Sequence, residues 1–225
     1  MKKLFLALLV AATIHVNAQE KVANKATTSS QKFRFALNGG FSRLLAKTST
    51  SLSPQNKAYV DQLKSGVNFG VDAGYFVAKD WGLGLKFNQF RSSHTGLLYD
   101  ANNFAVNAST DLVNTFFGPS FSTKYDSQNK KHMLLLSAAI GYMHYWSHNG
   151  FIKTTGGTVG SALDFGYDYR ITKNFALGAQ LSFVGGALSK LTQTNGSMSV
   201  TSELEDNKKE SMARLDISIG ARFNF

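Results

Sequence analysis

The sequence predicts an all-β fold, an eight-stranded antiparallel up-and-down transmembrane β-barrel. Eight segments alternate apolar and polar residues with a period of two, which places the two kinds of side chain on opposite faces of a strand. The connections between these segments alternate between long and short. After residue 18, no stretch approaches the ~18 continuous apolar residues that a membrane helix requires. The pattern therefore predicts a chain that crosses a membrane with strands.

The clearest alternation lies at residues 213–225. Its odd positions, from Ala213 to Phe225, are all apolar, and its even positions are polar, charged or glycine. The other seven segments are 33–42, 67–77, 81–88, 111–125, 134–146, 162–170 and 175–183. An even number of strands is what a single-chain bacterial barrel requires. Since proline cannot donate to a strand ladder, we expect a bulge near Gly118-Pro119 in the fourth segment.

The lengths of the connections predict the topology. The long, polar connections are 47–65, 91–110, 147–157 and 189–210, and the short ones are 78–80, 126–131 and 171–174. Outer-membrane barrels have short periplasmic turns and longer external loops. We therefore expect four external loops, with both chain ends in the periplasm. Asn195-Gly196 indicates a small hairpin in the last loop, and we interpret Gly156-Gly157 and Gly185-Gly186 as turn or loop glycines.

The first 18 residues have the layout of a secretory signal peptide. Met1-Lys2-Lys3 supplies positive charge, residues 4–14 form an apolar run, and Val16-Asn17-Ala18 precedes the expected cleavage site. Residues 19–32 show no periodicity and predict a disordered periplasmic tail. The barrel domain then covers 33–225. No cysteine is present, which excludes both a lipoprotein anchor and disulfides.

Aromatic residues are expected to gather at the two rims of the barrel, where amphipathic rings lie at the level of the lipid headgroups. The periplasmic rim collects Phe33, Phe35, Tyr75, Trp81, Phe121, Tyr125, Tyr167, Tyr169, Phe175, Phe223 and Phe225. A looser outer cluster contains Phe41, Phe69, Phe87, Tyr142, Trp146 and Phe183.

The two faces of the strands differ in size, which indicates which face meets lipid. The apolar face is bulky, whereas the polar face is rich in glycine and suits the narrow bore of eight strands. The predicted lumen contains Arg34, Asp72, Lys86, Asp164, Asp168, Arg170, Arg214, Asp216 and Arg222. Buried charges are tolerated when they are paired. We expect a structural ion network, and the alternative is a selective path for protons or small ions.

The chain resembles the small outer-membrane β-barrel family typified by the N-terminal domain of OmpA and by OmpX. The resemblance rests on the signal peptide, the eight alternating segments and the terminal Phe223-Asn224-Phe225. It implies a multi-pass location in the bacterial outer membrane, with Phe223 and Phe225 as the signal for the barrel-assembly machinery. With no segment after the barrel, a peptidoglycan-binding domain is not implied.

Charge and secretion limit the partners. The formal net charge is +10, and it falls to +8 when Lys2 and Lys3 are removed. Such a balance is typical of nucleic-acid binding, which secretion excludes. Outer-membrane lipids and the phosphates of lipopolysaccharide are the expected counter-charges. We expect a monomer without cofactor or metal, and the ligand of the external loops stays open.

Three functions are compatible with this chain. The first is a structural, surface-interaction or adhesion role carried by the four external loops. The second is a narrow channel for ions or small solutes, and the third is a lipid A-modifying enzyme. The third would use His144, Ser147 and His148, but the family pattern of a serine two residues after a histidine is not met, because Trp146 and Gly150 occupy those positions. We therefore predict that the protein is not an enzyme.

Overall fold

The computed structural model of the chain describes residues 31–46, 52–99, 104–204 and 209–225. The chain divides into Met1–Ser30 and Gln31–Phe225. The predicted signal peptide and most of the predicted tail belong to the first unit and lie outside the described residues. In the second unit, no described helix is both long enough and apolar enough to cross a membrane.

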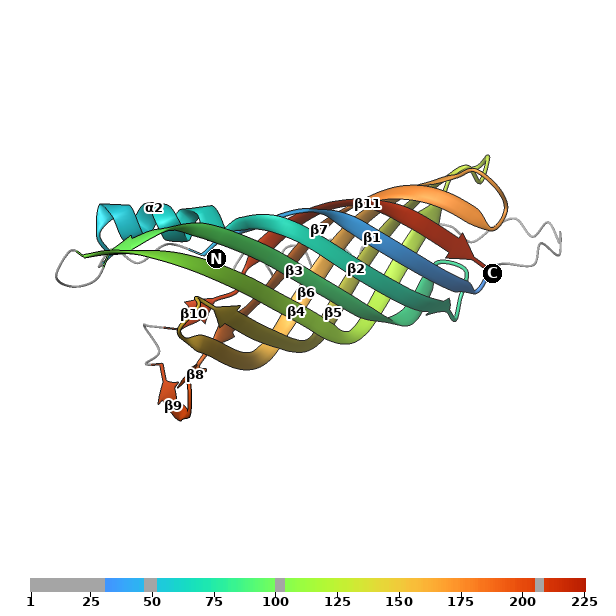
Figure 1. Ribbon diagram of the computed structural model, residues 1–225. Helices are drawn as coiled ribbons and strands as arrows, with labels where there is room; N and C mark the ends of the chain where they lie inside the picture. The colour runs from blue at the N-terminus through green and yellow to red at the C-terminus, as the bar shows by residue number, and fades with distance from the viewer. Residues whose placement is uncertain (1–30, 47–51, 100–103, 205–208) are drawn as a thin grey trace, which may run out of the picture. The chain divides into compact units, whose positions relative to one another are not determined.

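Eight strands form a closed antiparallel ring (Figure 1). They are β1 (Phe33–Leu44), β2 (Ser65–Phe76), β3 (Trp81–Tyr99), β4 (Ala105–Asp126), β5 (His132–His148), β6 (Lys153–Arg170), β7 (Phe175–Leu188) and β11 (Arg214–Asn224). Each of these strands pairs with the next one along the chain, and β11 closes the ring on β1 from Arg34↔Asn224 to Leu44↔Arg214. The predicted eight-stranded up-and-down barrel is confirmed.

The two ends of the barrel differ. One end, here called the turn end, carries the short connections 77–80, 127–131 and 171–174, as predicted. The opposite end is called the ribbon end, because β3 and β4 extend there as a two-stranded ribbon. At the ribbon end, the predicted loop 91–110 is wrong, because β3 and β4 pair without interruption out to Tyr99↔Ala105. The predicted loop 147–157 shrinks to residues 149–152. The predicted alternation of long and short connections is therefore wrong. The ribbon end is extended mainly by strands rather than by long loops.

Smaller elements complete the ribbon end (Figure 1). Helix α2 (Pro54–Leu63) lies within the first predicted loop and begins after Ser53, whose hydroxyl accepts from the Asn56 N–H. The predicted hairpin at Asn195-Gly196 is confirmed as β8 (Lys190–Asn195) and β9 (Met198–Glu203), with Gly196 at a positive φ of 56°. Strand β8 pairs with the outer part of β6, and the short β10 (Glu210–Ser211) continues the pairing of β11 with β7.

Two local predictions are wrong. The register of β4 against both neighbours is constant across Pro119, so no residue is inserted there and no bulge forms. The pairing of β4 with β5 omits Gly118 and Pro119, so it requires no hydrogen bond from the N–H that proline lacks. The glycines at 156–157 and 185–186 lie inside β6 and β7 rather than in loops. A Cβ at Gly157 would lie 1.9 Å from the Tyr142 hydroxyl oxygen, so the Tyr142 ring would have to shift to accommodate a side chain there.

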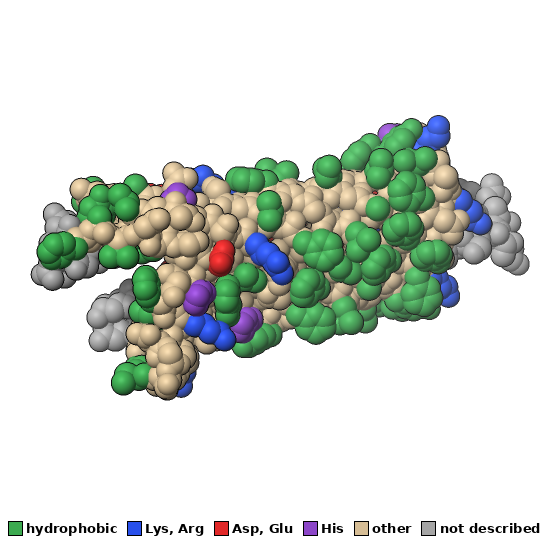
Figure 2. Space-filling view, in the orientation of Figure 1, with side chains coloured by type: hydrophobic (Ala, Val, Ile, Leu, Met, Phe, Trp, Pro, Cys, Tyr) green, Lys and Arg blue, Asp and Glu red, His purple; other side chains and the backbone are tan. Residues whose placement is uncertain are grey.

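The barrel has an apolar outside and a polar inside. Ile219 is 73% exposed on the outer face of β11, while Arg222 on the inner face of the same strand is fully buried. Hydrophobic side chains cover much of the visible barrel wall (Figure 2). At the turn end, rings from neighbouring strands pack in pairs, such as Trp81 with Phe121 at 6.0 Å and Phe175 with Phe223 at 5.5 Å. This is the distribution of a barrel that is solvated by hydrocarbon.

Closure of the ring is testable at Gly220. A Cβ at this inward-facing position would lie 1.8 Å from the carbonyl oxygen of Leu37 on β1. We expect Gly220→Val to cost at least about 1–3 kcal/mol through overpacking and to abolish the fast-migrating folded band in unheated gels. Ala221→Val, a change of similar size on the outer face of the same strand, should keep that band. Equal folding of both variants would contradict the observed β1–β11 contact.

Candidate functional site

At the turn end of the lumen, one aspartate lies between two arginines and pairs with both. The carboxylate of Asp168 on β6 accepts from the guanidinium of Arg34 on β1 at 2.8 Å and from that of Arg222 on β11 at 3.1 Å. All three side chains are buried. Because β6 and β1 lie three strands apart in the ring, this pair links opposite walls.

A second ion-pair layer lies further along the bore. Lys86 Nζ lies 3.0 Å from Asp164 and 3.2 Å from Asp72. Asp72 also accepts from the side-chain amide of Asn38 at 2.9 Å. Lys86 and Asp164 belong to β3 and β6, which are again three strands apart. The ammonium group is therefore fixed between two carboxylates in the centre of the lumen.

A third layer lies nearer the ribbon end. Arg214 and Asp216 pair along β11 at 3.2 Å, and both side chains are fully buried. Arg214 also reaches across the bore to donate to the side-chain oxygen of Asn88 on β3. Neutral hydrogen bonds fill the neighbouring space, such as that from the Ser218 hydroxyl to Asn68 at 2.7 Å.

Arg170 lies at the turn-end edge of the predicted network. It lies at the end of β6 and pairs with Asp126 on β4 at 2.7 Å, in a partly exposed position at the turn-end rim. The other eight predicted residues lie in the described lumen, four positive and four negative. The ion pairs of the bore are thus balanced in charge.

An apolar plug, which the sequence did not predict, lies on the ribbon-end side of the lumen. The plug consists of Phe116, Ala139, Met143, Ala162, Val184, Leu188 and Met212, all buried against one another. A signal was present at Phe116, which lies on the face of the fourth segment opposite to that of Val113 and Phe117, so the apolar residues do not alternate cleanly there. On β4 this residue faces inward, next to Asn88 of β3 in the register.

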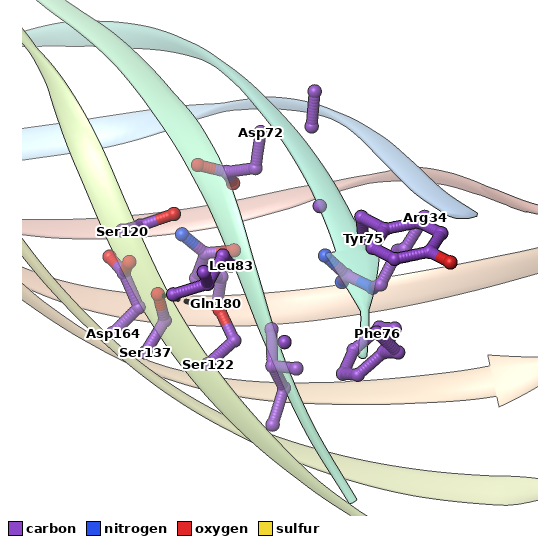
Figure 3. A pocket seen from close by; sticks show the side chains of 14 residues that line it. Arg34, Asp72, Tyr75, Phe76, Leu83, Ser120, Ser122, Ser137, Asp164 and Gln180 are labelled. Atoms are coloured by element: carbon purple, nitrogen blue, oxygen red, sulfur yellow. Dashed lines mark hydrogen bonds between the residues drawn. The ribbon is translucent and has the colours of Figure 1, made fainter. Parts of the chain in front are cut away.

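Little free space remains between these layers. A cavity of about 20 Å³ lies toward the turn end, bordered by Arg34, Asp72, Asp164 and Gln180. Figure 3 shows the side chains that surround it. A space of this size holds roughly one water molecule. The described lumen is a packed interior.

Beyond the barrel, β3 and β4 continue as a two-stranded ribbon that carries α2. The hydroxyl of Tyr59 lies 2.8 Å from Thr110 Oγ1 and 3.1 Å from the His94 carbonyl oxygen. The side chain of Asn56 exchanges two hydrogen bonds with the backbone of Tyr99, at 2.8 and 2.9 Å. These contacts fix the helix to the ribbon.

The serine and histidines considered for lipid A chemistry do not form a pair. Ser147 has the inward parity of Met143 on β5, whereas His144 and His148 have the outward parity of Tyr142. Successive side chains of a strand point to opposite faces. A hydroxyl on one face of the wall and an imidazole on the other give no Ser-His nucleophile. Within the described residues, no group of three or more metal-binding side chains gathers either.

The two terminal phenylalanines occupy different positions. Phe223 packs between strands, paired with Phe35 and Phe175 in the register. Phe225 is exposed, although its N–H donates to the Phe33 carbonyl at 2.9 Å. Gln31 and Lys32, from the predicted tail, bond to this same end, where the Lys32 N–H donates to the Phe225 carbonyl at 2.7 Å. Recognition of these phenylalanines by an assembly machinery stays a prediction.

Comparisons with known proteins support the fold. No family model matches the chain, and no curated protein sequence matches it. Among solved structures, neisserial surface protein A matches with a TM-score of 0.52 and 15% identity over 86% of this chain and 97% of that one. The chain has the fold of a small outer-membrane β-barrel. The N-terminal barrel of Pseudomonas aeruginosa OprF matches at 0.45 and 15%, over 87% and 98%, and the Escherichia coli protease OmpT at 0.47 and 9%, over 90% and 99%.

The ion pairs of Asp168 with Arg34 and Arg222, here called the Asp168 bridge, are expected to stabilise the folded barrel. Removing its charge by Asp168→Asn leaves two buried arginines without their carboxylate, which costs about 3–5 kcal/mol. Asp126→Asn breaks the rim pair with Arg170, whose side chains are less deeply buried, and should cost less than Asp168→Asn. Urea unfolding in lipid vesicles, followed by the fluorescence of Trp81 and Trp146, measures both. Similar losses for the two variants would show that the bridge is not a main support of the lumen.

The β8–β9 hairpin contains an exposed pair with a defined pH response. Lys190 Nζ lies 2.6 Å from Glu203, and this hydrogen bond lowers the pKa of Glu203 and raises that of Lys190. A lowered folded pKa means that the contribution of Glu203 to hairpin stability is present above its unfolded pKa and is lost as the pH falls through the folded value. The effect is small because both side chains are exposed.

An NMR titration of the Glu203 carboxyl tests this pair. We expect its pKa to rise in the Lys190→Gln variant, since the ammonium donor is gone. Lys153→Gln, which changes an exposed lysine of β6 at the same end of the barrel, serves as a comparison for the general loss of one positive charge. An unchanged Glu203 pKa in Lys190→Gln would refute the pairing.

Proposed function

We propose that the protein is an outer-membrane barrel that anchors a binding surface outside the cell and does not conduct ions. The observation that carries this proposal is the contrast between the two parts of the molecule. The bore is filled with cross-linked side chains, while the ribbon end extends into a ribbon, a helix and a hairpin. The turn end then faces the periplasm and the ribbon end faces the exterior.

The filled bore supports an anchor over a channel. Ion pairs join opposite walls at Asp168 and at Lys86. On the ribbon-end side of these layers lies the apolar plug, and a hydrophobic constriction opposes ion passage by excluding water. An eight-stranded barrel is in any case only wide enough for its side chains.

The ribbon end supports a surface-interaction role. Apolar side chains are exposed there at Leu97 and Val106 on the ribbon and at Met198 and Val200 on the hairpin. Where exposed apolar side chains form a contiguous patch, they are typical of an interaction site. The described sheet also ends at β9, whose only strand neighbour is β8. An exposed edge strand offers backbone groups to an extended segment of a partner.

The decisive experiment shortens the ribbon without disturbing its base. Thr95 and Ser109 face each other in the register, so residues 96–108 can be replaced by Asn-Gly, a two-residue hairpin turn. This retains His94 and Thr110, two ribbon partners of the Tyr59 hydroxyl, and removes Ala108 and Tyr99, which also form hydrogen bonds with α2. Cells displaying the intact protein should adhere to at least one member of a panel of immobilised extracellular glycoproteins and polysaccharides, and cells with the shortened ribbon should lose that adhesion.

A matched control replaces the turn 127–131 by Asn-Gly at the opposite end of the barrel. This variant should adhere as well as the intact protein. No adhesion by the intact protein, or equal adhesion after ribbon shortening, would overturn the proposed role.

Conductance tests the anchor against the channel. The intact protein in a planar lipid bilayer should give no discrete current steps, because three ion-pair layers and the apolar plug occupy its bore. An open porin in the same bilayer provides the positive control. Reproducible single-channel steps from the pure protein would favour the channel.

A further inference from the structure

A polar groove lies on the outer wall of the barrel, on the side formed by β2 to β5. It is shallow and open, and its lining combines polar side chains with apolar ones: Gln89, Arg91, Asp111, Thr115, His144 and Trp146 lie beside Val67 and Val113. Figure 2 shows basic, acidic and histidine side chains gathered on this face beside the hydrophobic surface. These residues are not part of the lumen or of the ribbon surface described above.

The strand register orders this wall into rows. An aromatic row of Phe87, Phe117 and Tyr142 is followed, one row closer to the ribbon end, by Gln89, Thr115 and His144. The next row contains Arg91, Val113 and Trp146, and the one after it contains Ser93, Asp111 and His148. Across β3 to β5 the exterior changes from an aromatic row to a polar row, while β2 stays apolar, with Phe69 beside Gln89 and Val67 beside Arg91.

Arg91 is held in place but keeps donors available. Its Nε donates to the Gln89 side-chain oxygen at 2.7 Å, and the Gln89 amide donates to Thr115 Oγ1 at 3.1 Å. This chain of bonds runs across β3 and β4 and fixes the guanidinium on the wall. The Arg91 side chain is exposed, and among the described residues its terminal Nη groups form no ion pair. A planar guanidinium whose two Nη groups form no ion pair suits a phosphate oxygen pair.

We propose that this groove binds a phosphorylated saccharolipid of the outer leaflet, the lipid A part of lipopolysaccharide, with Arg91 as its phosphate ligand. The proposal rests on the outer-membrane placement proposed above. The order of the rows matches the order of chemical groups in such a lipid. Acyl chains lie against Phe87, Phe117 and Tyr142, and the phosphate meets Arg91 and His144.

Asp111 and Trp146 favour a sugar over a simple phospholipid headgroup. Asp111 lies one row beyond Arg91, roughly 7 Å along the strand. A carboxylate there repels a second phosphate but accepts hydrogen bonds from sugar hydroxyls. Trp146, stacked on His148 at 6.2 Å, offers an indole surface at the same level as Arg91. A lipid with a phosphate but no sugar would leave these two residues without a role.

Binding is tested with the folded full-length barrel in detergent, with diphosphoryl lipid A as the probe. Arg91→Gln should weaken binding roughly tenfold or more, since a charged hydrogen bond is lost. His144→Gln should weaken it less. Dephosphorylated lipid A should bind the Arg91→Gln variant and the unaltered protein equally. Phosphatidylglycerol micelles should bind the unaltered protein more weakly than diphosphoryl lipid A does.

Arg43→Gln is the matched control, because Arg43 is an exposed arginine of the neighbouring β1 that donates to Ser65 and does not line the groove. It should change binding less than twofold. Equal loss of lipid A binding in Arg43→Gln and Arg91→Gln would show that general charge attraction, rather than a site at Arg91, accounts for the binding, and it would overturn the proposal. Unchanged binding in Arg91→Gln, or equal binding of phosphatidylglycerol, would also overturn it. None of these results depends on adhesion or conductance, so the proposed function can fail separately.

Discussion

The hydrogen bonds between β11 and β1 are the constraint from which the rest of the structure follows. In hydrocarbon a backbone N–H or C=O has no water partner, so a spanning sheet must have no open edge. The register from Arg34↔Asn224 to Leu44↔Arg214 removes that edge. Closure then separates two environments. The outer face must be apolar to meet lipid, and the inner face receives every polar side chain that the strands carry.

The charged side chains on the inner face of the barrel are stabilised by ion pairs. A bore of eight strands excludes most water, so each charge in it needs an opposite charge within reach. The structure meets this need with links across the bore, from Asp168 to Arg34 and from Asp164 to Lys86. Such links also hold opposite walls together. The apolar plug contains no charges that require partners, and it occupies the bore on the ribbon-end side of the ion pairs. Ion pairs and apolar side chains together therefore fill the interior.

Alternation predicted the fold because the two faces of each strand meet different surroundings within the membrane. It failed at 91–110 because both faces of the ribbon meet water or other protein there, and the period of two disappears although the strands continue. The apolar plug was missed for a related reason, since the lumen is not uniformly polar. The rim position of Arg170 depends on its reach to Asp126, a contact between distant strands that no local pattern contains.

The groove on the outer wall depends on the same register that organises the lumen. Phe90 is fully buried and Arg91, its neighbour, is exposed. A slip of β3 by one residue would exchange their faces, placing a guanidinium in the bore and a phenyl ring in the groove. The pairing of Lys86 with Asp72 and Asp164 resists such a slip, because it would carry Lys86 out into lipid. The buried ion pairs therefore do more than balance charge. They set which side chains the wall presents at the boundary between hydrocarbon and headgroups.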